Sequence, residues 1–415
     1  MRFLHTSDWH LGVEMEGRKR YEETQALLNY IIQTINDQKI DTLLVTGDVF
    51  DTHTPSNLAT KQYYDFLEAL HSTMVQNVII IAGNHDSPTY LEAPANLLKL
   101  LNIHVIGSIQ NNHLEREVIP LKDGDKVTAV ACAVPYLISP GLQGKSQAEQ
   151  DAAYEAYVVG HYKDVVKLAK ETCPDVPLVA LGHFFAVGGK VSDDKALRGN
   201  IHSVNINNFP LDDIDYLALG HLHKAQKIKG IEKVRYPGSL LKMSFVECDS
   251  DKEFVIWDTA NPEQFSSVPV TRSVVPQICR MVVCEGKVAE LEAELKKLRD
   301  NEANNKETVP LWVAVQNTGV FCHELKNRLE NLLGDKSGLD LVICQNVELN
   351  PAIVKIKGHK QRIEDMTPEK LFDIFLQENR LDNGENALSK DDLEWFRLQV
   401  NELHRGCVEA DTNKD

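Results

Sequence analysis

Five apolar runs of this chain end in polar side chains of the kinds that bind metal ions or transfer protons. The signatures SDWH, GDVFD, GNHD, GHFF and GHLH begin at Ser7, Gly47, Gly83, Gly182 and Gly220. A single His near the end of a strand is usually a hydrogen-bonded core residue, so one signature alone says little. Five in one chain, each behind an apolar run, indicate a shared site.

The ligand types in these signatures indicate which metals would bind. Carboxylates, imidazoles and one amide, without a thiolate, suit Mn, Fe, Zn or Mg better than soft copper or an iron–sulfur cluster. Seven ligands are too many for one ordinary ion, whereas two ions about 3.5 to 4 Å apart that share a carboxylate would use them all. Such a pair would ionise a bound water for attack on phosphorus and offset the charge on its oxygens. The seven residues are Asp8, His10, Asp48, Asn84, His183, His221 and His223.

The elements that must position these residues are strands of an α/β fold. In the first 135 residues, β-rich runs such as RFLHTS, TLLVTG and NVIIIAG alternate with helical patterns at 20–38, 56–73 and 89–101. This alternation predicts βαβ units around a mainly parallel sheet, and such sheets bind ligands beyond the carboxyl ends of their strands. Further strands are predicted at KVTAVACAVPY, PLVALGH, DYLALGH and KEFVIWD, with a helix over 147–171 and a hairpin formed by AQKIKG and KVRYPGS.

Changes in composition along the chain predict three domains, over 1–260, 271–358 and 366–406. The stretch TANPEQFSSVPVTRS, at 259–273, is polar and contains Pro, which is typical of a connection between domains. After it, alternating β and α patterns predict a small α/β domain without catalytic signatures. In the last domain, the spacing of apolar residues predicts two amphipathic helices, capped by Thr367 and Ser389. They have little core of their own, so they either pack on their own domain or dock onto another chain.

The composition, 43% hydrophobic and 25% charged over 415 residues, is that of a folded globular protein. No run approaches the roughly 18 apolar residues of a membrane helix and no signal peptide is evident, so we expect a cytoplasmic protein without a membrane partner. The eight cysteines form no C-x-x-C pair, which favours reduced thiols. The net charge of −17 argues against binding a polyanion by bulk electrostatics alone, so cations would come from metals or a partner.

The five signatures resemble, in full, the pattern of the calcineurin-like metallophosphoesterases, which is D-x-H, G-D-x-x-D, G-N-H-D, G-H and G-H-x-H. The resemblance implies their fold class, an α/β sandwich of two mixed sheets flanked by helices. It also implies how the seven residues divide between two ions bridged by Asp48: Asp8, His10 and His223 hold the first, and Asn84, His183 and His221 hold the second.

The same resemblance implies roles for the remaining polar residues of GNHD. His85 would contact the phosphate and protonate the leaving alkoxide as general acid, and Asp86 would orient the His85 ring. Two roles stay open for Asp51. It either belongs to the site or forms a hydrogen bond that only fixes the turn after Asp48.

Longer stretches are similar to the SbcD family of bacterial repair nucleases: MRFLHTSDWHLG, GDVFDTHTPS, AGNHDS, LGHLHKAQ, VRYPGSLLKMSF and TPEKLFDIFL. Protein phosphatases of the superfamily instead read G-D-x-V-D-R-G and G-N-H-E. The resemblance implies Mn-dependent cleavage of DNA, with Mg possible. The activities implied are a 3'–5' exonuclease on double strands and an endonuclease on single strands and hairpins, in DNA repair and recombination, at work on the nucleoid.

The resemblance also implies partners. Residues 1–260 would be the nuclease domain, 271–358 a capping domain that orients DNA, and 366–406 a helical hairpin that docks on an SbcC-type ABC ATPase with a coiled coil. A homodimer within a heterotetramer is expected. Because the chain has no P-loop signature, any ATP dependence would reside in that partner. The alternatives are a metallophosphatase or cyclic-nucleotide phosphodiesterase and a noncatalytic DNA-bridging scaffold.

Basic residues follow two of the signatures. Lys190 and Arg198 come after GHFF, and Lys227 and Lys229 come after GHLH. They either contact the DNA backbone or belong to a solvated charged face.

Overall fold

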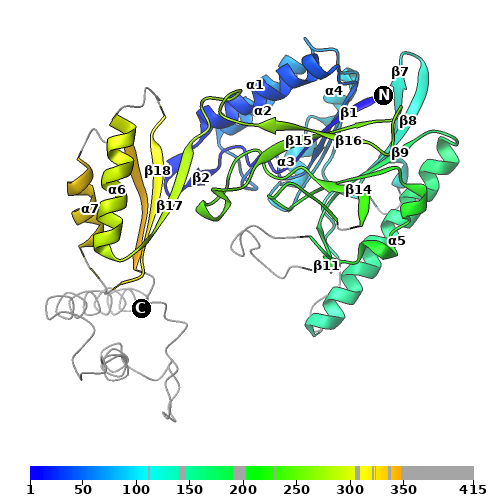
Figure 1. The fold of residues 1–415 in the computed structure, drawn as a ribbon. Helices are drawn as coiled ribbons and strands as arrows, with labels where there is room; N and C mark the ends of the chain where they lie inside the picture. Colours follow the sequence, from blue (N-terminus) through cyan, green and yellow to red (C-terminus); the bar gives the residue numbers. More distant parts are fainter. Residues whose placement is uncertain are drawn as a thin grey trace, which may run out of the picture. The chain divides into compact units, whose positions relative to one another are not determined.

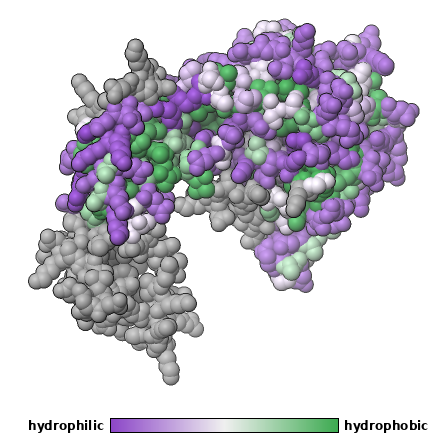
Figure 2. Space-filling view, viewed as in Figure 1, coloured by the Kyte–Doolittle hydropathy of each residue, from purple (hydrophilic) through white to green (hydrophobic). Residues whose placement is uncertain are grey.

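A computed structural model of the chain (Figure 1) describes residues 1–110, 113–139, 146–189, 202–228, 230–303, 309–319, 322, 324–334 and 338–346. The chain divides into two units, Met1–Ile278 and Cys279–Asp415. Hydrophilic residues cover most of the visible face of the first unit (Figure 2). Among the residues that the structure describes, no helix is both long and apolar enough to cross a membrane.

The first sheet of the first unit carries three of the five signatures. β1, β4, β5 and β6 are parallel, and β15 pairs antiparallel with both β1 and β16. In spatial order the strands are β16 (Phe265–Val270), β15 (Lys252–Asp258), β1 (Arg2–Thr6), β4 (Thr42–Thr46), β5 (Asn77–Ile81) and β6 (Ile103–Ile106).

Two helices, α1 (Tyr21–Gln38) and α2 (Asn57–Leu70), cover the outer face of this sheet (Figure 1). Leu27, Ile31 and Ile35 of α1 are spaced about one turn apart and are buried against the sheet. The predicted helix over 89–101 is not continuous. It divides into α3 (Pro88–Glu92), α4 (Ala95–Leu98) and the 3-10 turn η1 (Lys99–Leu101). Pro94 lies at the break, because it has no N–H to continue a helix.

The second sheet carries the other two signatures. Its order is β13 (Gln226–Ile228), β14 (Ile231–Tyr236), β12 (Tyr216–Gly220), β9 (Leu178–His183), β8 (Lys126–Ala133) and β7 (Val118–Asp123). The predicted hairpin is β13 and β14, and the predicted helix over 147–171 is α5 (Gln147–Thr172), which packs on the outer face of this sheet. Smaller elements are β2 (Glu14–Met15), β3 (Arg18–Lys19), β10 (Phe185–Ala186), β11 (Ser203–Val204), η2 (Leu114–Arg116), η3 (Ile206–Asn208), η4 (Leu211–Asp213) and η5 (Phe245–Glu247).

The two sheets pack face to face around a shared apolar core. Leu44 and Ile79 of the first sheet and Val179 and Ala131 of the second belong to one buried cluster. The architecture is therefore the predicted α/β sandwich of two mixed sheets flanked by helices. The prediction that 259–273 is only a connection was wrong, because β16 lies within it. Within the described part of the chain, β16 pairs with β15 alone, and an edge strand of this kind tolerates Pro269 and an exposed polar face.

The described residues of the second unit form a three-stranded parallel sheet with two helices. Its elements are β17 (Arg280–Gly286), α6 (Val288–Ala303), β18 (Leu311–Asn317), α7 (Leu325–Leu333) and β19 (Leu339–Asn346), close to the predicted strands and helices. Leu291 and Leu295 of α6 and Leu329 of α7 are buried with Val313 and Val315 of the sheet. The predicted helices of 366–406, and the end of the predicted domain 271–358, lie outside the described residues.

Candidate metal centre

The ends of β1, β4 and β5 in the first sheet meet the ends of β9 and β12 in the second. Hydrogen bonds between the loops join them: Asp8 N donates to Gly47 O at 3.0 Å, and His10 N donates to Asp48 O at 3.0 Å. His221 N, from the second sheet, donates to the Asp8 carboxylate at 3.1 Å. The sandwich therefore brings together all the predicted ligands.

Asp48 lies at the centre of this group. Its Oδ2 is 3.3 Å from His183 Nε2 and 3.6 Å from His10 Nε2, and its Oδ1 accepts a hydrogen bond of 2.8 Å from His85 N. Burial alone would raise the pKa of Asp48, but the charge and hydrogen bond of His183 and the charge of His10 hold it well below its usual range. One anionic oxygen is thus shared by imidazoles on two sides.

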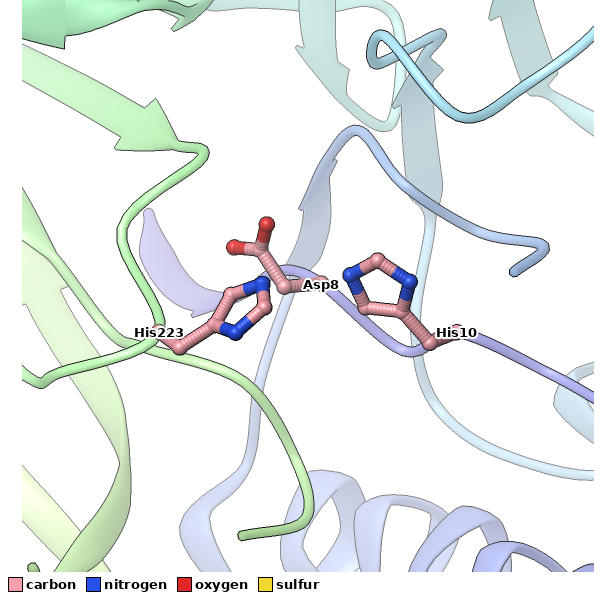
Figure 3. A group of neighbouring side chains, drawn as sticks. All are labelled: Asp8, His10 and His223. Atoms are coloured by element: carbon pink, nitrogen blue, oxygen red, sulfur yellow. The ribbon is translucent and has the colours of Figure 1, made fainter. Parts of the chain in front are cut away.

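Two clusters of ligand atoms surround Asp48. The ligand atoms of Asp8, His10 and His223 lie within 4.8 Å of one another. Figure 3 shows the two imidazole rings on either side of the Asp8 carboxylate. On the other side, Asn84 Oδ1 is 3.0 Å from His183 Nε2 and 2.9 Å from His221 Nδ1. Asp8 and Asp48 also lie with His183 in a group whose ligand atoms are within 4.8 Å of one another, so the division between two ions that the family resemblance implies stays a prediction.

The proton positions of two buried imidazoles test whether cations fit here. His183 Nδ1 is 2.8 Å from the carbonyl oxygen of Thr46, so it must carry the proton, and a neutral ring then turns unprotonated Nε2 toward two oxygens. Burial alone would lower the pKa of His183, but the charge and hydrogen bond of Asp48 raise it to about 9. A cation between Nε2 and these two oxygens would satisfy all three atoms. In the absence of the cation, a proton on Nε2 does so.

His10 presents the same arrangement. Its Nδ1 is 3.1 Å from Asp51 Oδ1, while its Nε2 is buried and has no hydrogen-bond partner among the described residues. A buried nitrogen without a partner is costly unless something binds it. The donor set of nitrogens, carboxylates and one amide oxygen therefore fits two divalent cations.

The backbone at the ligands is also unusual. Asp8, His10, Asp48 and His221 have φ angles of 51°, 45°, 51° and 99°, in the region that favours glycine. Such conformations cost roughly 1–3 kcal/mol each and persist where the surrounding structure holds them, often at functional sites.

His85 lies beside the two clusters. Its ring centroid is 4.8 Å from that of His10, and its Nδ1 is 2.9 Å from the carbonyl oxygen of Asp51. Since Nδ1 must donate to that carbonyl, Nε2 is the nitrogen left to face a substrate. Asp51 thus orients two rings, His10 through its carboxylate and His85 through its carbonyl oxygen.

Asp86 does not orient the His85 ring, and that prediction was wrong. Its carboxylate accepts hydrogen bonds from Gly83 N at 2.9 Å, Phe50 N at 2.9 Å and Val49 N at 3.1 Å. Burial and the nearby charge of Asp48 raise the pKa of Asp86 to about 6. Asp86 therefore ties the GDVFD and GNHD loops together.

Two residues near His223 were missed by the sequence analysis. Glu247 is fully buried, and its Oε1 lies 3.7 Å from His223 Nδ1. Its Oε2 is 2.7 Å from Nζ of buried Lys252. Burial alone would raise the pKa of Glu247, but His223 and Lys252 lower it to about 2. No spacing or motif marks VECDSDKEF as part of the site, so no sequence signal could have found them.

The structure describes only one of the four basic residues that were predicted to contact DNA. Lys227 is half exposed and its Nζ lies 2.5 Å from Glu232 Oε1. Any phosphate would compete with that carboxylate. Lys190, Arg198 and Lys229 lie outside the described residues.

Comparison with known proteins shows which family and which proteins the chain is similar to. The family model of calcineurin-like phosphoesterases matches residues 1–225. The SbcD component of nuclease SbcCD from Escherichia coli (strain K12) is 31% identical over 93% of this chain and 95% of its own length. The proteins of the same name from Rhodobacter capsulatus and Bacillus subtilis (strain 168) are 32% and 31% identical, over 66% and 73% of this chain and 70% and 77% of their own lengths.

Proposed function

The chain belongs to the calcineurin-like phosphoesterases and, within them, to the SbcD family, and from this premise we propose which DNA reaction it performs. It is a metal-dependent phosphodiesterase, a nuclease of the SbcCD type. We infer that it uses Mn²⁺ as a 3'–5' exonuclease on double-stranded DNA and an endonuclease on single strands and hairpins. The observation that carries the proposal is the convergence of His10, His183 and their neighbours on one oxygen of Asp48.

The proposed ligands follow the two observed clusters. Asp48 would contribute to both ions; Asp8, His10 and His223 would complete the first, and Asn84, His183 and His221 the second. Two divalent ions held by these residues would supply an activated water for attack on phosphorus and would offset the charge on the phosphate oxygens.

His85 is proposed as the general acid. The carbonyl oxygen of Asp51 holds Nδ1, which leaves Nε2 to donate a proton. When the bond between phosphorus and the leaving deoxyribose oxygen breaks, that oxygen takes the electron pair and receives the Nε2 proton. Asp86 holds the loop that presents His85 and needs no contact with the substrate.

A test of the reaction uses duplex DNA labelled at the 5' end of one strand. We expect Mn²⁺ to support progressive shortening from the 3' end and cutting of a closed hairpin. Asp48→Asn, which removes the shared charge, should abolish both. Hydrolysis of small phosphomonoesters or cyclic nucleotides without any cleavage of DNA would favour a phosphatase or a cyclic-nucleotide phosphodiesterase. Binding of DNA without hydrolysis would favour a scaffold.

The partner of the nuclease is proposed to be an SbcC-type ABC ATPase in a heterotetramer, docked on the amphipathic helices of 366–406. The domain over 271–358 is proposed to orient DNA. A chain ending at about residue 360 should keep Mn-dependent cleavage and lose copurification with SbcC. Undiminished copurification would disprove the docking.

A homodimer is proposed through the apolar surface of α4 and η1. Leu97, Leu100 and Leu101 are 67%, 79% and 54% exposed, and adjacent exposed leucines of this kind mark an interaction surface. Leu100→Glu should convert a dimer to a monomer in sedimentation velocity. Ile138→Glu, at another residue that is 77% exposed, is the matched control and should leave the dimer intact.

A further inference from the structure

A buried ion pair lies behind the metal-centre residue His223. Glu247, in η5, is 0% exposed and Lys252, at the start of β15, is 5% exposed. Glu247 Oε2 and Lys252 Nζ are 2.7 Å apart. Neither residue belongs to the five signatures.

The pair approaches the ring of His223 and binds its backbone. Glu247 Oε1 lies 3.7 Å from His223 Nδ1, an ion-pair distance beyond a hydrogen bond, and this buried nitrogen has no hydrogen-bond partner among the described residues. Met243 N donates to Glu247 Oε2 at 3.2 Å. Lys252 Nζ donates to the carbonyl oxygen of His223 at 2.8 Å and to Ser239 Oγ at 2.8 Å. Lys252 therefore holds the backbone of His223, and Glu247 is the charged group that faces its Nδ1.

Stability alone is a poor reason to bury such a pair. Removing two charges from water costs free energy that their attraction often fails to recover, so an apolar replacement of a buried pair is commonly neutral or stabilising. A carboxylate behind a metal-binding imidazole, by contrast, fixes the orientation of the ring and raises the basicity of its nitrogen.

We propose that Glu247 and Lys252 are positioning residues that set the affinity of one of the two metal sites, the one that contains His223. This inference rests on the proposed metal role of His223. Glu247 orients and polarises the imidazole. Lys252 fixes the backbone of His223 and balances the charge of Glu247.

The two sites differ in what supports their imidazoles. His10 and His223 have the carboxylates of Asp51 and Glu247 behind them, whereas His183 has the neutral carbonyl oxygen of Thr46. Loss of Glu247 should therefore weaken one metal-binding event and leave the other unchanged. This asymmetry separates positioning from general damage to the fold.

The test measures Mn²⁺ binding by calorimetry on the full chain. For Glu247→Gln we expect one of two binding events to weaken by about 10- to 100-fold, the usual effect of losing such a partner. The melting temperature should also fall, because Lys252 is left buried without its counter-charge. Glu23→Gln is the matched control. It breaks a buried pair with Arg20, whose Nε is 2.8 Å from Glu23 Oε1, and should lower stability without changing Mn²⁺ binding.

The double variant Glu247→Gln with Lys252→Met decides between positioning and structure, even if Glu247→Gln alone does not fold. We expect it to recover most of the melting temperature while one Mn²⁺ still binds weakly. Recovery of both stability and two full-affinity sites would overturn the inference. If the unaltered chain bound no Mn²⁺ pair, the proposed metal centre itself would fail, which is a different result.

Discussion

Replacement of His85 by Ala tests the proton-transfer step separately from metal binding. Asp51 fixes Nδ1 of His85 at 2.9 Å, so the ring is held in place with Nε2 as the only nitrogen left for a substrate. A positioned general acid contributes about 10²- to 10⁴-fold to the rate. At about 1.4 kcal/mol for each factor of ten, the variant should lose roughly 3–5 kcal/mol of transition-state stabilisation on DNA.

Two substrates with different leaving groups show whether that loss reflects protonation of the leaving oxygen. A deoxyribose alkoxide needs a proton, whereas p-nitrophenolate leaves without one. His85→Ala should therefore lose about 10²- to 10⁴-fold in kcat on DNA and less than about 10-fold on a p-nitrophenyl phosphodiester. Both rates are measured on one preparation with its Mn content determined by mass spectrometry. His113→Ala, at a His whose side chain is 59% exposed, is the control and should change neither rate.

Two outcomes would refute the acid role. Equal losses on both substrates would mean that His85 acts on something other than the leaving oxygen, such as binding of the phosphate. A fall in Mn content would mean that it is a ligand.

Three further predictions address the metal centre and the DNA surface. Because the pKa of His183 is raised to about 9, the metal-free protein holds a proton there at neutral pH, and binding must release it. Calorimetry in buffers of different ionisation enthalpy should find at least one proton released at neutral pH and fewer above pH 9; no release at neutral pH would contradict the metal role of His183. In Gly83→Ala the new Cβ would lie 2.7 Å from Asp48 Cγ, so Mn²⁺ affinity should fall more than about 10-fold and stability by about 1–3 kcal/mol. Gly160→Ala, where nothing lies within 4 Å of the new Cβ, is its control and should keep full affinity. Lys227→Glu should reduce the slope of log K against log salt for DNA by about one, and an unchanged slope would show that this residue contacts no phosphate.

The ligands could be read from the sequence because each signature is local. A strand end and the polar residues after it lie within a few positions of each other, and parallel strands end at one edge of a sheet. The role that the resemblance implied for Asp86 was wrong, because residues that are adjacent in sequence need not have side chains in contact. In the folded loop its carboxylate turns to the amides of Gly83, Val49 and Phe50.

The contacts that support the ligands could not be predicted from local sequence patterns. Glu247 and Lys252 reach His223 across 24 and 29 positions, through a tertiary arrangement that no spacing rule describes. β16 was missed because its polar, Pro-containing sequence resembles a linker. An edge strand exposes one face and one row of backbone groups, so its composition carries little of the alternation that marks an inner strand.

The glycines of the signatures explain why the pattern of ligands is so regular. A Cβ on Gly220, before His221, would meet the carbonyl oxygen of Thr46 in the first sheet, and one on Gly47, before Asp48, would meet His183 Nδ1 in the second. The loops of the two sheets thus touch at positions where no side chain fits. This close approach brings Asn84 Oδ1 to about hydrogen-bond distance of two imidazoles, 3.0 Å from His183 and 2.9 Å from His221. Each glycine is therefore as much a part of the metal centre as the ligand that follows it, because it sets the distance between ligands that come from different sheets.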